Sequence, residues 1–128
     1  MDVKTILLVV ADAARRVAIG EALRLEAHSV LVVESTEEAV EVVRSIAQPA
    51  SLIVTDQRLD VGEGRILASL VASRIPTARI LLLTGFGAIT PKLATYFLDR
   101  DASPEAVARV ASRIVSQPSR PNNELSST

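Results

Sequence analysis

The stretch SLIVTDQRLDVGEG, residues 51–64, runs from aliphatic sequence into an acid and then into a polar segment with two glycines. Residues 52–54 are Leu, Ile and Val, and Asp56 follows two positions later. A carboxylate is costly in a protein interior, so an acid directly after apolar sequence needs a reason. The stretch predicts a buried strand that ends at a polar edge, where Asp56 would lie, with a helix after the turn.

Other apolar runs of the same kind divide the chain at regular intervals. The four runs are TILLVV (5–10), VLVV (30–33), SLIV (51–54) and RILLLT (79–84), with the more polar ATYFLD (94–99) as a weaker fifth candidate. None of the four alternates apolar and polar residues, which is typical of parallel strands that are covered on both faces.

Helix-length segments separate these runs, at 12–27, 36–47, 63–75 and from Ser103 onward. Ser35 with Glu38 forms a capping box, and Ser103 followed by Pro104 is a typical helix start. We expect the buried helix faces to carry Ala18, Ile19, Ala22, Leu23, Ala39, Val42, Val43, Ile46, Ile66, Leu67, Leu70, Val71, Val107, Val110, Ala111 and Ile114. Strands that alternate with helices predict an α/β fold with a doubly wound parallel sheet.

Composition limits the possible functions. The 128 residues hold 14 basic and 15 acidic side chains, 2% aromatics and no cysteine. Few rings and no basic stripe disfavour nucleic-acid binding. We see no membrane-spanning run and no signal peptide, and the lack of cysteine fits a cytoplasmic protein. Residues 1–116 should form one domain, and the polar segment 117–128 a disordered tail.

Several polar residues fall at expected strand ends. Asp12, Asp56 and Thr84 follow or close three of the runs, and Arg100 follows the fifth. Functional groups of open parallel sheets gather at the carboxyl ends of the strands. A carboxylate, a hydroxyl and a cation at one edge suit phosphoryl chemistry, with Asp56 as nucleophile. Each residue alone also has an ordinary structural explanation, since Asp starts turns and Thr is common in strands.

The segment TDQRLDVGEG resembles the surroundings of the phospho-accepting aspartate in response-regulator receiver domains, with Asp56 as acceptor and Gly64 as the glycine that opens the third helix. LLLTGFG (81–87) resembles the fourth strand of that family, whose terminal Thr contacts the phosphoryl group, here Thr84. The resemblance covers roughly residues 4–115 and implies the flavodoxin-like (βα)5 fold. It implies two-component phosphorelay signalling, in which a histidine kinase or phosphotransfer protein phosphorylates Asp56 with magnesium and a downstream regulatory protein responds.

The first departure from the family pattern concerns magnesium. The two adjacent acids that end the family's first strand align with Val10 and Ala11. Asp12 comes one position later, as a metal ligand or as the N-cap of the first helix. A hard dication needs several oxygen ligands, so magnesium binding is possible but expected to be weak.

Further departures lie around the fifth strand. Arg100 replaces the family lysine, and Asp101 replaces the proline that follows it. Only sixteen positions separate Thr84 from Arg100, so the helix between the fourth and fifth strands should be short or missing. These features favour an atypical, degenerate receiver, in which phosphorylation is weakened or lost and protein contacts carry the function.

Alternatives remain. A flavin or small-ligand binding flavodoxin-like domain would need a glycine- or hydroxyl-rich loop after the first strand, where ADAARR stands. A phosphatase-type enzyme would need a general acid at Arg58, so we expect no enzyme. We expect a stand-alone receiver, with a homodimer possible, no membrane partner, and His28 as a solvated loop residue.

Overall fold

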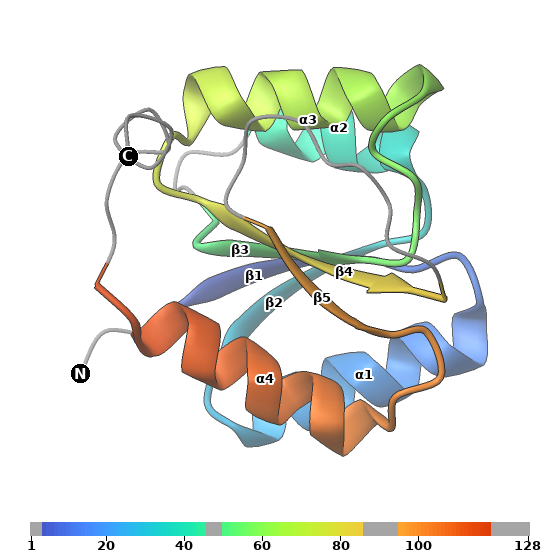
Figure 1. The fold of residues 1–128 in the computed structure, drawn as a ribbon, viewed down its shortest axis with the longest axis vertical. Coiled ribbons are helices and arrows are strands. Elements are labelled where there is room, and N and C mark those ends of the chain that lie inside the picture. Colours follow the sequence, from blue (N-terminus) through green and yellow to red (C-terminus); the bar gives the residue numbers. More distant parts are fainter. Residues whose placement is uncertain (1–3, 46–49, 86–94, 119–128) are drawn as a thin grey trace.

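The computed structural model describes residues 4–45, 50–85 and 95–118, and these contain one sheet of five parallel strands (Figure 1). The strands are β1 (Thr5–Val9), β2 (Ser29–Val33), β3 (Leu52–Thr55), β4 (Arg79–Thr84) and β5 (Thr95–Asp99). They lie in the order β2-β1-β3-β4-β5, and every pair is parallel. The predicted doubly wound parallel sheet is therefore confirmed, including the weak fifth strand.

Four described helices cover both faces of this sheet. They are α1 (Ala13–Leu25), α2 (Thr36–Ser45), α3 (Gly62–Arg74) and α4 (Pro104–Ser116). The pair α1 and α4 packs on one face and the pair α2 and α3 on the other (Figure 1). The prediction of a short or missing helix between β4 and β5 falls on residues 86–94, outside the described residues. None of the helices in the described ranges is long and apolar enough to cross a membrane.

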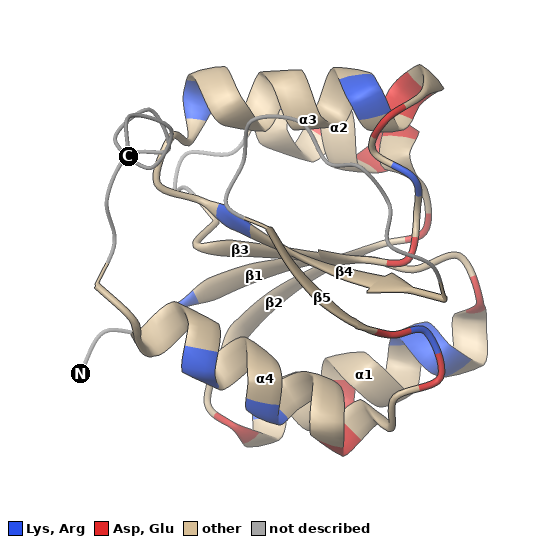
Figure 2. Cartoon of the chain, in the orientation of Figure 1, with Lys and Arg blue, Asp and Glu red and all other residues tan. Residues whose placement is uncertain are grey.

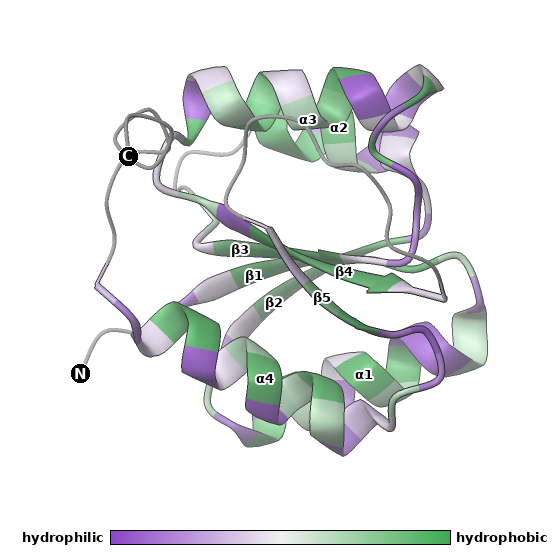
Figure 3. Ribbon diagram, in the orientation of Figure 1, coloured by the Kyte–Doolittle hydropathy of each residue, from purple (hydrophilic) through white to green (hydrophobic). Residues whose placement is uncertain are grey.

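The central strands explain why their sequences lack alternation. In β1, Leu7 and Val9 point to the core under α2 and α3, and Ile6 and Leu8 point to the core under α1 and α4. Strands β3 and β4 divide their side chains in the same way. Figure 3 shows the result, with hydrophobic residues along the strands and on the inward helix faces. Both faces of these strands are buried, so their positions are mostly apolar, and the buried polar residues Thr55 and Arg79 both donate hydrogen bonds.

Two expectations about burial are wrong. β2 lies at the edge of the sheet, where Leu31 and Val32 are 36% and 37% exposed, so this strand is not covered on both faces. Ile66 is 45% exposed. The buried stripe of α3 instead consists of Gly64, Leu67, Ala68 and Val71. Small residues occupy part of this stripe, so counting large aliphatic residues placed the face incorrectly.

The predicted helix starts are confirmed by their capping bonds. The carboxylate of Asp12 accepts a 2.9 Å hydrogen bond from the Arg15 backbone N–H. Ser35 Oγ accepts from the Glu38 N–H at 3.1 Å, and Ser103 Oγ begins α4 in the same manner. Such caps satisfy N–H groups that have no partner inside the helix.

A buried arginine holds the end of α4. Arg79, the first residue of β4, is 8% exposed and donates to the carbonyl of Ile114 at 2.6 Å and to that of Gln117 at 3.3 Å. It also donates to the carbonyl of Pro118, and the hydroxyl of Tyr96 donates to Gln117 Oε1 at 2.9 Å. A cation is favourable at a helix C-terminus, where carbonyl groups carry partial negative charge.

His28 is not the solvated loop residue that the sequence predicted. It is half-buried in the turn between α1 and β2, and its Nε2 lies 2.8 Å from Ser112 Oγ on α4. The Ser112 hydroxyl also donates to Glu26 Oε1 at 2.5 Å. Burial lowers the pKa of His28, and the negative charge of Glu26 opposes this shift.

Two leucines on α1 provide a matched test of the fold. Leu23 is 0% exposed and Leu25 is 87% exposed. Leu23→Asp would bury a charge with no partner and should lower the free energy of unfolding by more than ~3 kcal/mol. Leu25→Asp should change it by less than about 0.5 kcal/mol, as is usual at the surface. Urea unfolding of both variants measures the difference, and equal losses would contradict the helix packing.

The lowered pKa of His28 predicts a pH dependence of stability. The unfolded chain has the ordinary histidine pKa of 6.5 and binds a proton more tightly than the folded protein does. The free energy of unfolding should therefore fall as the pH drops through 6.5, and His28→Gln should lose this part of the slope. Urea titrations across this pH range test the expectation. Identical slopes for the two proteins would show that His28 does not contribute.

Candidate functional site

The predicted site residues lie at one edge of the sheet. Asp56 directly follows β3, Thr84 is the last residue of β4, and Arg100 directly follows β5. Thr84 on β4 pairs with Asp99 on β5. Arg100 is the residue after Asp99, so it lies just past the position opposite Thr84. Figure 2 shows acidic and basic residues in the loops at this carboxyl edge, whereas the strands are mostly uncharged. The structure therefore brings the three segments to one edge, while the roles of the side chains stay predictions.

Thr55 fixes the backbone on which Asp56 lies. Its side chain is fully buried, and Oγ1 donates to the Val9 carbonyl at 2.9 Å and accepts from the Gln57 N–H at 3.0 Å. Gln57 in turn donates from Nε2 to Asp56 Oδ1 at 2.8 Å. Asp56 is partly exposed, so its carboxylate is held in place and still reached by solvent. Sequence reasoning missed Thr55 and Gln57, although a threonine before a strand-end acid is a usable signal.

The loop after Asp56 depends on one glycine. A Cβ added to Gly64 would lie 1.7 Å from the carbonyl oxygen of Arg58, so only glycine fits there. Leu59 is 2% exposed and joins the core under α2 and α3. Gly62 starts the helix with a positive φ of 54°. The spacing between Asp56 and Gly64 that the sequence singled out therefore reflects close backbone packing.

Arginine holds the end of β1. Val10 is buried, and Arg16 donates from Nη1 to the carbonyls of Val10 at 2.8 Å and Ala11 at 2.9 Å. Arg16 Nη2 also lies 3.6 Å from Glu34 Oε2 beyond β2. The positions that align with the two missing acids thus offer apolar side chains, and their backbone oxygens already have a cationic donor.

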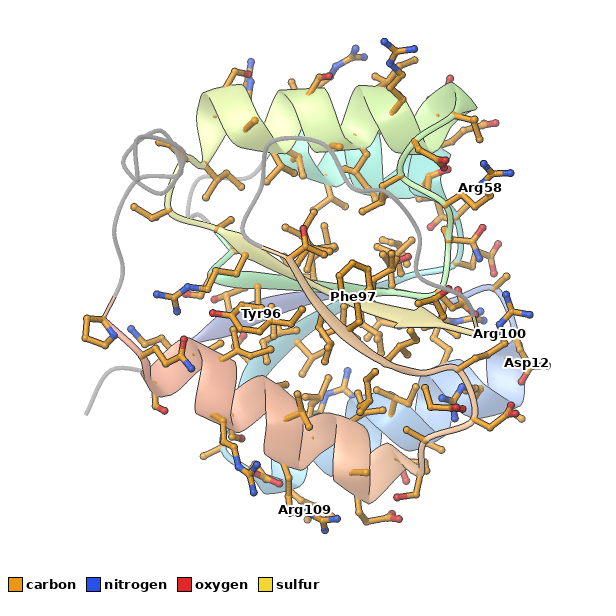
Figure 4. The ribbon with its side chains drawn as sticks, in the orientation of Figure 1. Asp12, Arg58, Tyr96, Phe97, Arg100 and Arg109 are labelled. Atoms are coloured by element: carbon orange, nitrogen blue, oxygen red, sulfur yellow. The ribbon has the colours of Figure 1, made fainter. Side chains whose placement is uncertain are left out.

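A second arginine joins α1 to the loop after β5. Arg15 Nη2 donates to the Arg100 carbonyl at 2.5 Å. Figure 4 shows Asp12, Arg58 and Arg100 on the same side of the molecule. The Asp101 N–H donates to Asp99 Oδ1 at 2.8 Å, a bond that a proline at this position could not make. The loop that carries Arg100 is therefore set by these two hydrogen bonds. Sequence reasoning missed Arg15 and Asp99.

Two other acids in the loops at this edge, Asp12 and Asp60, already have hydrogen-bond partners. Asp12 accepts its capping bond, and both oxygens of Asp60 accept from Arg58, at 3.0 and 2.8 Å. The hydrogen bond from Arg58 lowers the pKa of Asp60, and the same bond raises the pKa of Arg58. Among the described residues, no three His, Cys, Asp or Glu side chains come close enough to share a metal ion. A dication prefers several oxygen ligands, and Asp12 and Asp60 already use carboxylate oxygens in the hydrogen bonds above.

Comparison with known proteins assigns the fold. No family model matches the chain. The chain is 35% identical over 85 residues to the response regulator protein FleR of Pseudomonas aeruginosa. The matched segment is 66% of this chain and 17% of FleR.

Solved receiver domains have the same architecture. The receiver domain of the hybrid histidine kinase CckA gives a TM-score of 0.72 at 21% identity, over 87% of this chain and 98% of that one. A response regulator receiver protein of Sinorhizobium medicae gives 0.73 at 20%, over 90% and 96%. The chemotaxis response regulator CheY4 of Vibrio cholerae gives 0.70 at 20%, over 88% and 99%.

The chain therefore has the fold of response-regulator receiver domains. The predicted flavodoxin-like (βα)5 fold and the resemblance to response regulators are both confirmed. The alternative, a flavin-binding domain of this architecture, is not favoured by these similarities.

Gly64 tests the packing of the loop after Asp56, and Gly20 in α1 is its control. Gly64→Ala would force the Arg58 carbonyl aside and should lower the free energy of unfolding by roughly 2–4 kcal/mol. Gly20→Ala, within α1, meets neighbours no closer than 3.5 Å and should raise it by roughly 0.5–1 kcal/mol. Thermal and urea unfolding of both variants measure the contrast. A tolerated Gly64→Ala would mean that this close approach does not exist in solution.

Proposed function

We propose that this chain is an atypical receiver module of two-component phosphorelay signalling, in which Asp56 is the phosphoacceptor. The observation that supports this most strongly is the position of Asp56 directly after β3, in a loop held by the contact of Gly64 with Arg58. The donor is a histidine kinase or a phosphotransfer protein. Phosphorylation of Asp56 then alters the contact of this chain with a downstream regulatory protein.

The chemistry assigns one role to each residue. A carboxylate oxygen of Asp56 attacks the phosphorus of a phosphohistidine, the P–N bond breaks, and its electron pair returns to the imidazole, leaving an acyl phosphate. The hydroxyl of Thr84 and the guanidinium of Arg100 hold the phosphoryl oxygens. Arg100 supplies a permanent positive charge, so part of the charge stabilisation needs no metal. An arginine fork is not equivalent to the family lysine, which makes slow transfer the expected result.

Other aspects of the proposal rest on the receiver fold in general. Receiver domains are signalling modules rather than enzymes, so the function of this one lies in contacts with partner proteins. We assign the module to residues 1–116, with 117–128 as its tail, and place it in the cytoplasm. The first two tail residues, Gln117 and Pro118, are bound by Arg79 and Tyr96. FleR is a response regulator and the CckA domain is part of a hybrid histidine kinase, which makes a kinase partner reasonable.

Phosphorylation of Asp56 is directly testable. Incubation with acetyl phosphate and magnesium should slowly add one phosphoryl group to the protein, detected by intact mass. Asp56→Asn should abolish the addition because an amide oxygen is a poor nucleophile. Asp60→Asn is the matched control, since Asp60 is bound to Arg58 and should not matter. An unmodified wild-type protein, or a modified Asp56→Asn variant, would contradict the proposed acceptor.

Magnesium binding tests the missing acids. The unmodified protein should bind magnesium no tighter than the millimolar range, equivalent to about −4 kcal/mol. Val10→Asp with Ala11→Asp should tighten binding by restoring two carboxylates, whereas Val10→Asn with Ala11→Asn should not. Isothermal calorimetry measures both, and a thermal melt checks that the variants fold, because Val10 is buried. Micromolar binding by the unmodified protein would make Asp12 a ligand after all.

A further inference from the structure

A groove between α1 and α4 is one surface feature that the proposed chemistry leaves unused. It has a volume of about 430 Å³ and is lined by residues of both helices. Its floor consists of small side chains, Ala18 and Ala22 from α1 and Ala108 from α4. Small floor residues leave space for a side chain of a partner to approach the two helices closely.

One exposed aliphatic residue, Leu25, lines this groove. Leu25 lines one end of the groove and is 87% exposed, the highest value among the large hydrophobic residues of the described chain. Residues 18, 22 and 25 recur at the spacing that places side chains on one helix face. Leu25 is the exposed end of this row, and Ala22, at 7% exposure, is its buried part.

The rim of the groove is mostly acidic. Glu21, Glu26 and Glu105 line it, against the single cation Arg109. Figure 4 shows Arg109 on α4 directed away from the sheet. The lining therefore carries an excess of negative charge around an apolar floor. A basic partner gains from this charge, and an acidic partner is repelled.

We propose that this groove, the α1–α4 groove, binds an amphipathic helix of a partner protein, with apolar side chains on the floor and Lys or Arg residues against the rim. Apolar anchors at helical spacing are the usual way in which a helix occupies such a groove. A second copy of this chain is the poorer occupant, because a two-fold pair would bring the glutamate rims together. The inference goes beyond the proposed function, since it does not use Asp56 or phosphorylation.

The test uses a synthetic peptide of known composition. An 18-residue fluorescent helix of Leu and Lys spans roughly 27 Å, enough to cover α1. The full chain should bind it, and backbone amide shifts should concentrate on α1 and α4. Leu25→Ser, and Glu21→Lys with Glu105→Lys, should each weaken binding roughly tenfold in fluorescence anisotropy. Raising the salt concentration should weaken the wild-type complex as well.

Matched variants on α3 serve as controls. Ile66 is 45% exposed and Glu63 is also at the surface, so Ile66→Ser and Glu63→Lys should leave peptide affinity unchanged. A helix of Leu and Glu should not bind. Absent binding, equal binding of the acidic helix, or equal effects of the α1 and α3 variants would overturn the proposal. So would a concentration-dependent dimer that Leu25→Ser abolishes, because the occupant would then be a second copy.

Discussion

Burial of the central strands on both faces is the constraint on which the rest of the molecule depends. β1, β3 and β4 have neighbours on either side and helices above and below, so polar side chains are largely excluded from their length. The exception within β3 is Thr55, whose hydroxyl both donates and accepts a hydrogen bond. Groups with chemistry must therefore lie beyond the strand ends, which is where Asp56 and Arg100 are found.

The carboxyl edge combines an accessible acid with main-chain oxygens that arginines already bind. Arg16 covers the carbonyls at the end of β1, and Arg15 covers the carbonyl of Arg100. Asp12 and Asp60 are engaged in bonds of their own. Positive charge at this edge is thus part of the fold, because two arginine side chains bind its main-chain oxygens.

Most of the fold was predictable from the sequence, because aliphatic runs mark buried strands and capping residues mark helix starts. Ser35 and Ser103 marked helix starts correctly, and the weak β5 followed from the strand count. Ile66 was misplaced because Gly64 and Ala68 fill a tight interface that hydrophobicity does not reveal. Arg15 and Asp99 were missed because their bonds join segments far apart in the chain or depend on loop conformation.

The arginine beneath α4 has a consequence for protein engineering. Arg79 and Tyr96 hold Gln117 and Pro118 near the starts of β4 and β5, at the opposite edge of the sheet from Asp56. A reporter fused directly after Pro118 would therefore start from a fixed anchor. Small movements of α4 could then be read as changes in fluorophore distance. Replacing Arg79 would release the reporter from this anchor and leave the edge that carries Asp56 unchanged. A signal that this replacement abolishes would therefore come from movement of α4.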